Sequence, residues 1–193
     1  MIDTAPPALP GPDCQLRLLR EAELPAYKGL RDFMLARHPD AFTSDAETEL
    51  RREADSYRSR LSGGANGGCL FTLAAWQGRP GGPGGLDGQM VGAISCEREP
   101  RRKVRHIAHV VGMMVRDDAQ GQGVGRMLLQ QALRLLQGEP SLELAILSVT
   151  AGNQRAVRLY ERCGFIRYGR LEGAIRFADG TLLDKDLMRR RLR

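Results

Sequence analysis

The chain of 193 residues has no apolar run that approaches the roughly 20 residues needed to cross a bilayer, so no membrane association is expected. It has four cysteines, Cys14, Cys69, Cys96 and Cys163, which lie far apart and form no C-x-x-C pair. This spacing excludes the common zinc and redox motifs and predicts free thiols. Aromatic residues make up only 5% of the sequence. Because none is interleaved with the basic runs, the sequence does not support a stacking platform for single-stranded nucleic acid.

The N-terminal segment lacks the pattern of a secretory signal. Residues 1–13 contain no basic stretch followed by an apolar core, and they are rich in proline and alanine. We expect a disordered leader there, followed by a single domain over residues 14–193, because a chain of this length supplies one ordinary core. In the absence of a signal, the expected location is the cytoplasm.

The formal net charge is +6, and basic residues gather in segments 98–105 and 189–193. A positive balance suits an anionic ligand such as a nucleotide cofactor. We interpret the two basic segments as solvated surface and expect no nucleic-acid partner.

The apolar pattern switches between strand and helix periods along the chain. Seven strands are predicted, at residues 15–20, 69–76, 89–97, 104–115, 142–149, 165–171 and 183–190. Four helices are predicted, at residues 21–38, at 43–61, from a glycine turn to residue 137, and at 153–163. Residues 78–88, GRPGGPGGLDG, predict a long flexible hairpin loop. This order describes a mixed α/β sheet with helices packed on it.

The glycine turn lies between the fourth predicted strand and the third predicted helix. Residues 120–125 read QGQGVG and precede apolar residues at helical spacing. The first amides of a helix lack intrahelical partners and carry the positive end of its dipole, and glycines let an anion approach the backbone. The turn therefore predicts a phosphate-binding site.

Two other phosphate motifs do not fit this turn. The dinucleotide fingerprint G-x-G-x-x-G, counted from Gly121, requires a glycine where Arg126 stands. A P-loop requires Gly-Lys-Ser/Thr, which does not follow. Hydride transfer from a nicotinamide and P-loop phosphoryl transfer are therefore not predicted.

Two motifs in order resemble the GNAT superfamily of N-acetyltransferases. Gln120, Gly123 and Gly125 fill its Q/R-x-x-G-x-G/A signature, and the segment 153–165, N-x-x-A-x-x-L-Y-x-x-x-G-F, follows the next strand at the place that the family has it. The resemblance covers roughly residues 15–191. It implies the family's fold, with about seven strands, four helices, and fourth and fifth strands that splay apart.

The resemblance implies acetyl-coenzyme A (acetyl-CoA) as the co-substrate and no metal. The backbone of Met113, Met114 and Val115 would pair with the pantetheine arm, and the Met113 amide would bind the thioester oxygen, where negative charge grows during attack. Asn153 would contact the cofactor near the mouth of the cleft. The residues implied at the pyrophosphate are Gln120, Gly121, Gln122, Gly123, Val124, Gly125 and Arg126.

By the same resemblance, Tyr160 would donate a proton to the departing thiolate. His109 is our candidate for accepting the proton of the attacking amine, directly or through water, because imidazole changes charge near neutral pH. On a regular strand, His109 and Val115 would share a face. His106, three positions upstream of His109, is the weaker candidate. Cys163 has no supporting acid or histidine pattern and is interpreted as a packing residue.

The implied activity is direct transfer of an acetyl group to a primary amine of a small molecule, amino acid, peptide or protein. A non-catalytic acyl-CoA-binding sensor is the alternative, which Tyr160 and His109 disfavour. We expect acceptor choice to lie in segments 30–61 and 169–184. Several carboxylates there are candidates to attract a cationic amine, although such clusters more often form a solvated face. They are Glu47, Glu49, Glu53, Asp55, Glu172 and Asp184. Both a monomer and a homodimer remain open.

Overall fold

The structure is a computed structural model that describes residues 14–63, 68–78 and 88–193. Within these ranges, seven strands form one sheet in the order β1-β2-β3-β4-β5-β7-β6. The strands are β1 (Cys14–Leu18), β2 (Cys69–Gln77), β3 (Gln89–Arg98), β4 (Ile107–Val115), β5 (Leu144–Thr150), β6 (Ile166–Arg176) and β7 (Leu182–Arg191). The predicted mixed α/β fold is confirmed. The predicted leader and most of the predicted 78–88 loop lie outside the described residues.

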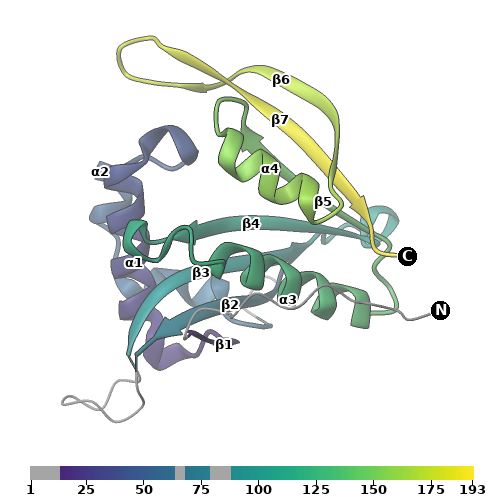
Figure 1. Ribbon diagram of the computed structural model, residues 1–193, viewed down its shortest axis with the longest axis horizontal. Coiled ribbons are helices and arrows are strands. Elements are labelled where there is room, and N and C mark those ends of the chain that lie inside the picture. Colours follow the sequence, from purple (N-terminus) through teal and green to yellow (C-terminus); the bar gives the residue numbers. More distant parts are fainter. Residues whose placement is uncertain (1–13, 64–67, 79–87) are drawn as a thin grey trace.

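The helices pack on both faces of the sheet. Helix α1 (Leu24–Arg37) and the short α2 (Ala46–Leu50) lie on one side, whereas α3 (Val124–Gly138) and α4 (Gln154–Arg162) lie on the other (Figure 1). The apolar stripe predicted on α3 is buried at Leu128, Leu129 and Leu136. Gly92 of β3 permits the close approach of α3, because a Cβ there would lie 2.9 Å from Leu128 Cδ1.

Strands β4 and β5 are the one parallel pair among the described strands, and they stay together for only three residues. The pairing runs from Ile107 opposite Leu144 to His109 opposite Ile146 and then stops. The rest of β4 therefore has no partner on β5, which confirms the expected splay. Strand β5 continues beside β7 along its whole length.

A bulge interrupts β4 just beyond that point. The register with β3 shifts between Val111 and Met114, and Gly112 has φ +58°, which favours glycine. Bulges reverse the alternation of side chains, so Val110, Met113 and Val115 all face α3 and α4. His109 lies one position before Val110 and faces the α1 side. The shared face of His109 and Val115 that a regular strand would give is therefore lost, because the bulge adds one residue between them.

The predicted helix 43–61 is wrong in its length. Helix α2 ends at Leu50, and a 3₁₀ helix follows at Ala54–Arg60. Tyr57 Oη donates a hydrogen bond of 2.6 Å to Glu49 Oε2. A straight helix would separate these residues by about 12 Å of rise. The chain breaks and folds back so that Tyr57 covers the buried carboxylate.

The predicted fourth strand, 104–115, begins later than expected. Residues Arg102–Val104 form a 3₁₀ turn and β4 starts at Ile107. His106 lies in the turn before β4, and its carbonyl accepts the amides of Glu143 and Leu144, at 2.9 and 3.2 Å. His106 is thereby placed outside the strand that carries His109.

Candidate functional site

A cavity of about 450 Å³ opens where β4 and β5 part. Its walls come from seven parts of the chain: α1, the α1–α2 connection, the 3₁₀ helix Ala54–Arg60, β4, β5, α4 with the residue before it, and the β6–β7 pair. Four predicted site residues line it, namely His109, Met113, Asn153 and Tyr160. The splay thus brings residues from both faces of the sheet into one space.

Tyr160 lies on the α4 side of this cavity. It is buried, its ring packs edge-on against Phe165, and its hydroxyl donates to Met113 Sδ at 3.5 Å. Burial raises the pKa of Tyr160 to about 12. The phenol is therefore protonated at neutral pH and placed beside the strand predicted to hold the thioester.

His109 lies on the α1 side, at the last paired position of β4 and β5. Its cross-strand neighbour on β3 is Glu97, which is ion-paired with Arg60. Arg60 also lines the cavity. The imidazole is partly exposed to the cavity, in a setting that contains one carboxylate and one guanidinium.

The glycine turn predicted to bind a phosphate is open, and it precedes the first bonded amide of α3. Gly121 and Gly123 have φ +80° and +86°, and a Cβ built on Gly121 would meet nothing within 4 Å. The first amide bonded back to the turn is that of Met127, which donates to the Gly123 carbonyl at 3.0 Å. The amides before it, up to Arg126, are those that a helix start leaves without intrahelical acceptors.

Gln120 holds the shape of this turn. Its side-chain amide donates to the Val115 carbonyl and to Asp117 Oδ1, both at 3.0 Å, and its oxygen accepts a hydrogen bond from Arg155. The side chain is thus engaged within the loop. Arg155 was missed by the sequence motifs, although it follows Asn153 by two positions. It places a guanidinium beside the turn.

Three further predicted cofactor residues, Asn153, Met114 and Gly125, make structural contacts, and of these only Asn153 lines the cavity. Asn153 caps α4 by accepting the Ala156 amide at 3.1 Å. The Met114 side chain is buried on the α1 side, so only its backbone is available to a ligand. A Cβ on Gly125 would lie 3.2 Å from Met113 Cε, so this glycine lets α3 start directly against β4.

Two cations on the opposite wall were not singled out from the sequence. Arg31 of α1 donates to Ser44 Oγ at 2.7 Å, and Lys185 of β7 donates to Thr43 Oγ1 at 2.8 Å. All four residues line the cavity. Lys185 lies one position beyond the segment 169–184 in which acceptor residues were expected. The two residues are 154 positions apart in the chain, so no local motif connects them.

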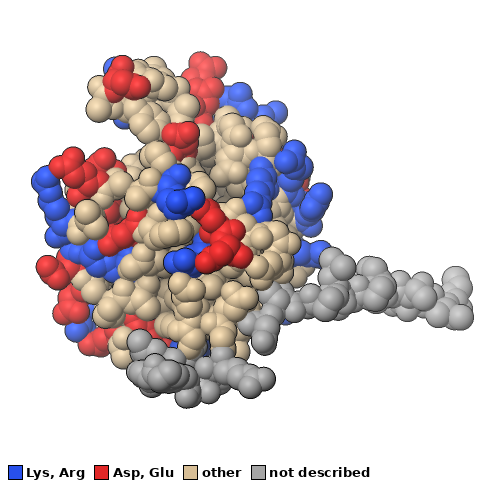
Figure 2. All heavy atoms as spheres, turned by 60° about the vertical axis from the view of Figure 1, so that its left-hand side comes forward, with Lys and Arg blue, Asp and Glu red and all other residues tan. Residues whose placement is uncertain are grey.

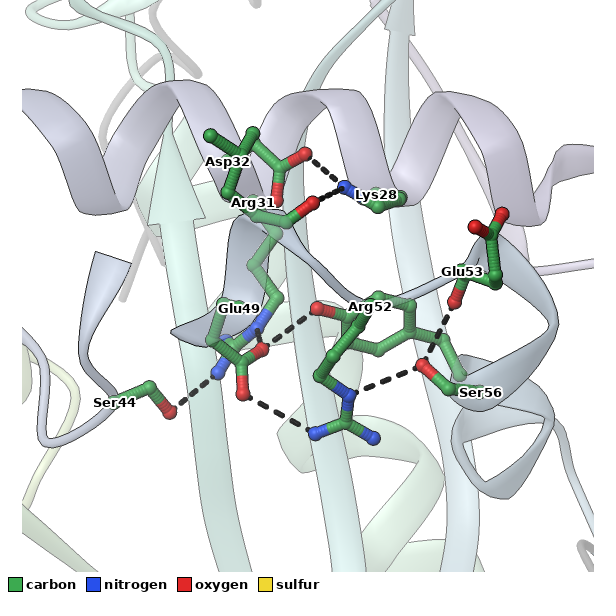
Figure 3. A network of polar contacts seen from close by, with 10 residues as sticks. Lys28, Arg31, Asp32, Ser44, Glu49, Arg52, Glu53 and Ser56 are labelled. Atoms are coloured by element: carbon green, nitrogen blue, oxygen red, sulfur yellow. Dashed lines mark hydrogen bonds and ion pairs between the residues drawn. The ribbon is translucent and has the colours of Figure 1, made fainter. Parts of the chain in front are cut away.

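The acidic candidates do not form the cavity wall. Glu49 is buried and accepts from Arg31, Arg52 and Tyr57 (Figure 3). Burial alone would raise its pKa, but the hydrogen bonds from Tyr57 and Arg31 outweigh that effect and hold the pKa at about 2. The other candidates point elsewhere: Glu47 pairs with Arg51 in solvent, and Asp184 accepts the Gly173 amide. Glu53, Asp55 and Glu172 are exposed and likewise do not line the cavity.

The described part of the chain contains no group of three or more histidine, cysteine, aspartate or glutamate side chains arranged to hold a metal ion. Nor is any described helix long and apolar enough to traverse a membrane.

Cys163 is buried at the end of α4, where its carbonyl accepts a hydrogen bond from Arg190, in agreement with a packing role. Basic and acidic side chains are interspersed on the face seen in Figure 2.

Comparison with known proteins gives a consistent match. Residues 32–165 match the family model described as the acetyltransferase (GNAT) family. Phosphinothricin N-acetyltransferase of Alcaligenes faecalis is 28% identical over 180 residues, which span 93% of this chain and 83% of that protein.

Solved structures show the same fold. A GNAT-family acetyltransferase of Streptococcus pneumoniae superposes with a TM-score of 0.74 at 21% identity, covering 92% of this chain and 98% of that one. An acetyltransferase of Salmonella typhimurium, determined with its cofactor acetyl-CoA, superposes with a TM-score of 0.71 at 17% identity, covering 93% and 94%.

Proposed function

Because the chain belongs to the acetyltransferase (GNAT) family, we propose that it is an N-acetyltransferase that moves an acetyl group from acetyl-CoA directly to a primary amine. The observation that carries the proposal is the cavity at the β4–β5 splay, which contains both a protonated tyrosine and a histidine. A site that only binds an acyl-CoA requires neither group.

The described residues fit acetyl-CoA as the donor. The open glycine turn, with unpaired amides at the start of α3, suits a pyrophosphate, and Arg155 adds positive charge beside it. Beyond His109, the β4 backbone has no partner on β5 and is free to pair with an extended arm. When bound, acetyl-CoA supplies a thioester that is activated toward amines.

We assign one role to each of three groups. The Met113 amide donates a hydrogen bond to the thioester oxygen, which gains negative charge during attack. Tyr160 Oη, which lies against Met113, donates its proton to the leaving sulfur. His109, on the other side of the same cavity, accepts the proton of the amine directly or through water. The amine's nitrogen then forms the new bond to the acetyl carbon as the carbon–sulfur bond breaks.

Thermal unfolding with and without acetyl-CoA tests the donor. A ligand bound by the folded state alone increases the free energy of unfolding, by about 2.7 kcal/mol at a hundredfold excess over Kd, and therefore raises the midpoint temperature. Release of free thiol in the presence of an amine panel then tests turnover. Stabilisation without thiol release from any amine would favour the acyl-CoA sensor, and the absence of stabilisation would remove both functions.

A further inference from the structure

The acceptor side of the cavity has an imbalance of charge. Three cationic side chains line it: Arg31, Arg60 and Lys185. Among the residues that the structure describes, no aspartate or glutamate lines the same cavity. Arg60 is neutralised by its ion pair with Glu97 just outside the lining. The imbalance therefore rests on Arg31 and Lys185.

Lys185 has no carboxylate partner in the described ranges. Its ammonium donates to the Thr43 hydroxyl, and half-burial lowers its pKa with no opposing contribution from an anion. The neighbouring acids are engaged elsewhere: Asp184 holds the Gly173 amide, and Asp186 is paired with Arg167 and Arg170. A half-buried ammonium without a counterion is stabilised by any anion that enters the cavity.

Arg31 is only partly compensated by its carboxylate. Glu49 is shared between Arg31 and Arg52, so the three side chains together carry a net positive charge. The Arg31 guanidinium uses Nε for Glu49 and Nη2 for Ser44. A guanidinium has five N–H donors and an ammonium three, so Arg31 and Lys185 retain spare donors. Arg31 is 7% exposed and held by α1, which gives those donors a defined direction.

Arg31 and Lys185 also hold in place the segment 40–44, which forms the wall on the acceptor side of the cavity. Residues 40–44 are held by Thr150 through the Asp40 carbonyl at 2.7 Å, by Lys185 through Thr43, and by Arg31 through Ser44. The wall is thus tied to α1, β5 and β7 at once. A ligand bound by Arg31 and Lys185 would lie in a preformed pocket, which reduces the entropy lost on binding.

We propose that the acceptor carries an oxyanion, a carboxylate or a phosphonate or phosphinate, which Arg31 and Lys185 bind while its amine faces His109. The inference rests on the proposed function. Because one cavity of about 450 Å³ contains both cations and His109, the oxyanion and the amine belong to one compact molecule. The substrate class is therefore amino acids and their phosphorus analogues. Charge-assisted hydrogen bonds of this kind are about twice as strong as neutral ones.

Matched pairs of acceptors test the proposal. Thiol release is measured with the common amino acids and with their α-amides, which keep the amine and side chain but lose the negative charge. We expect kcat/KM for the best acid to exceed that of its amide about 30-fold, the effect of one to two hydrogen bonds to charged groups. Aminoalkylphosphonates and amino phosphinates form a second arm that identifies the preferred oxyanion.

Variants of Lys185 connect that preference to the structure. Lys185→Met is expected to reduce the acid-to-amide ratio of kcat/KM about tenfold, and Lys185→Arg to restore most of it, because the charge returns. Lys103→Met removes a lysine that lies in an exposed turn and does not line the cavity, and it serves as the control for net charge. The ratio is measured within each variant, so a change in the amount of folded enzyme cancels.

The outcomes separate the two proposals. Thiol release with equal or higher kcat/KM for the amides would overturn the oxyanion proposal and leave the acetyltransferase intact. An acid preference that Lys185→Met leaves unchanged would also overturn it. If no compound of either arm releases thiol while another amine of the panel does, the oxyanion proposal alone fails. If no amine at all releases thiol while acetyl-CoA still stabilises the fold, both proposals fail.

Discussion

The two sides of the cavity are built in different ways. On the donor side, Met113, Ala156 and Tyr160, which line the cavity, are uncharged at neutral pH. Outside the lining, the glycine turn and the start of α3 offer backbone amides, with Arg155 beside them. On the acceptor side, side chains from α1 and β7 present two cations tied to the Thr43–Ser44 wall. Under the proposed function, the donor would be recognised mainly by main chain and the acceptor by side chains.

This difference determines which residues can be substituted without loss of binding. A backbone cradle depends on positive-φ glycines and close packing, so most side chains along it are free to vary. A side-chain pocket depends on the identity of each residue, and its charges need partners such as Glu49 to stay buried. We therefore expect related proteins to share the donor side more closely than the acceptor side.

The largest effect is expected at Tyr160. Tyr160→Phe removes the proposed proton donor and keeps the ring packed on Phe165. General acid catalysis contributes about 10² to 10⁴ in rate, so kcat should fall about 10³-fold with little change in the KM for acetyl-CoA. Steady-state kinetics checks this. Tyr27→Phe is the matched control, because the buried Tyr27 hydroxyl has no hydrogen-bond partner in the described ranges.

The buried carboxylate behind the acceptor side, Glu49, should contribute more to the free energy of unfolding than an exposed carboxylate of the same helix. Glu49→Gln leaves Arg31 and Arg52 without their carboxylate, and we expect a loss of about 3 kcal/mol at neutral pH in urea unfolding. Glu47→Gln, at a carboxylate 76% exposed and paired with Arg51, should change stability by less than about 0.5 kcal/mol.

The stability that Glu49 contributes should depend on pH. The folded pKa of Glu49 is about 2, below its usual 4.5, so the stabilisation is complete above pH 4.5 and is lost as pH falls toward 2. Glu49→Gln should flatten the stability profile in that window. A wild-type profile that is already flat there would contradict the assigned ion pairs.

The proton acceptor can be tested through pH. His109→Ala should lower kcat/KM about 10²-fold at pH 7, and the loss should shrink as pH rises, because the amine then arrives already deprotonated. His106→Ala, in the turn before β4, should leave the rate unchanged. A His109→Ala deficit that is constant with pH would assign this histidine a structural role.

The smallest effect is expected at the packed start of α3. Gly125→Val would displace Met113 and shift the first amides of the helix, so we expect acetyl-CoA affinity to fall about tenfold, or about 1.4 kcal/mol. Gly138→Val, at the far end of the same helix with nothing within 4 Å of its Cβ, is the control. Titration of acetyl-CoA by calorimetry measures both. Equal affinities for the two variants would contradict the cradle.

Much of the donor side was predictable because its signals are local. The strand before Gln120, the turn glycines and the apolar stripe of α3 are contiguous, and Asn153 with Tyr160 forms a second short motif. The bulge at Gly112 was not predicted, because a glycine in a strand indicates several different irregularities. It moved His109 to the face opposite Val115, which changed the geometry of the proposed proton transfer.

The sequence by itself determined the fold family and the order of elements, because periodicity and short motifs act over a few residues, and it predicted a phosphate site at the glycine turn, which stays a prediction. Only the tertiary structure decided which charged side chains line the proposed acceptor side of the cavity. Arg31 on α1 and Lys185 on β7 line one cavity and both donate to the Thr43–Ser44 segment. Glu49, a candidate for binding the amine, is instead the buried partner of Arg31. Pairing between distant side chains depends on packing, and packing leaves no periodic trace in a single sequence.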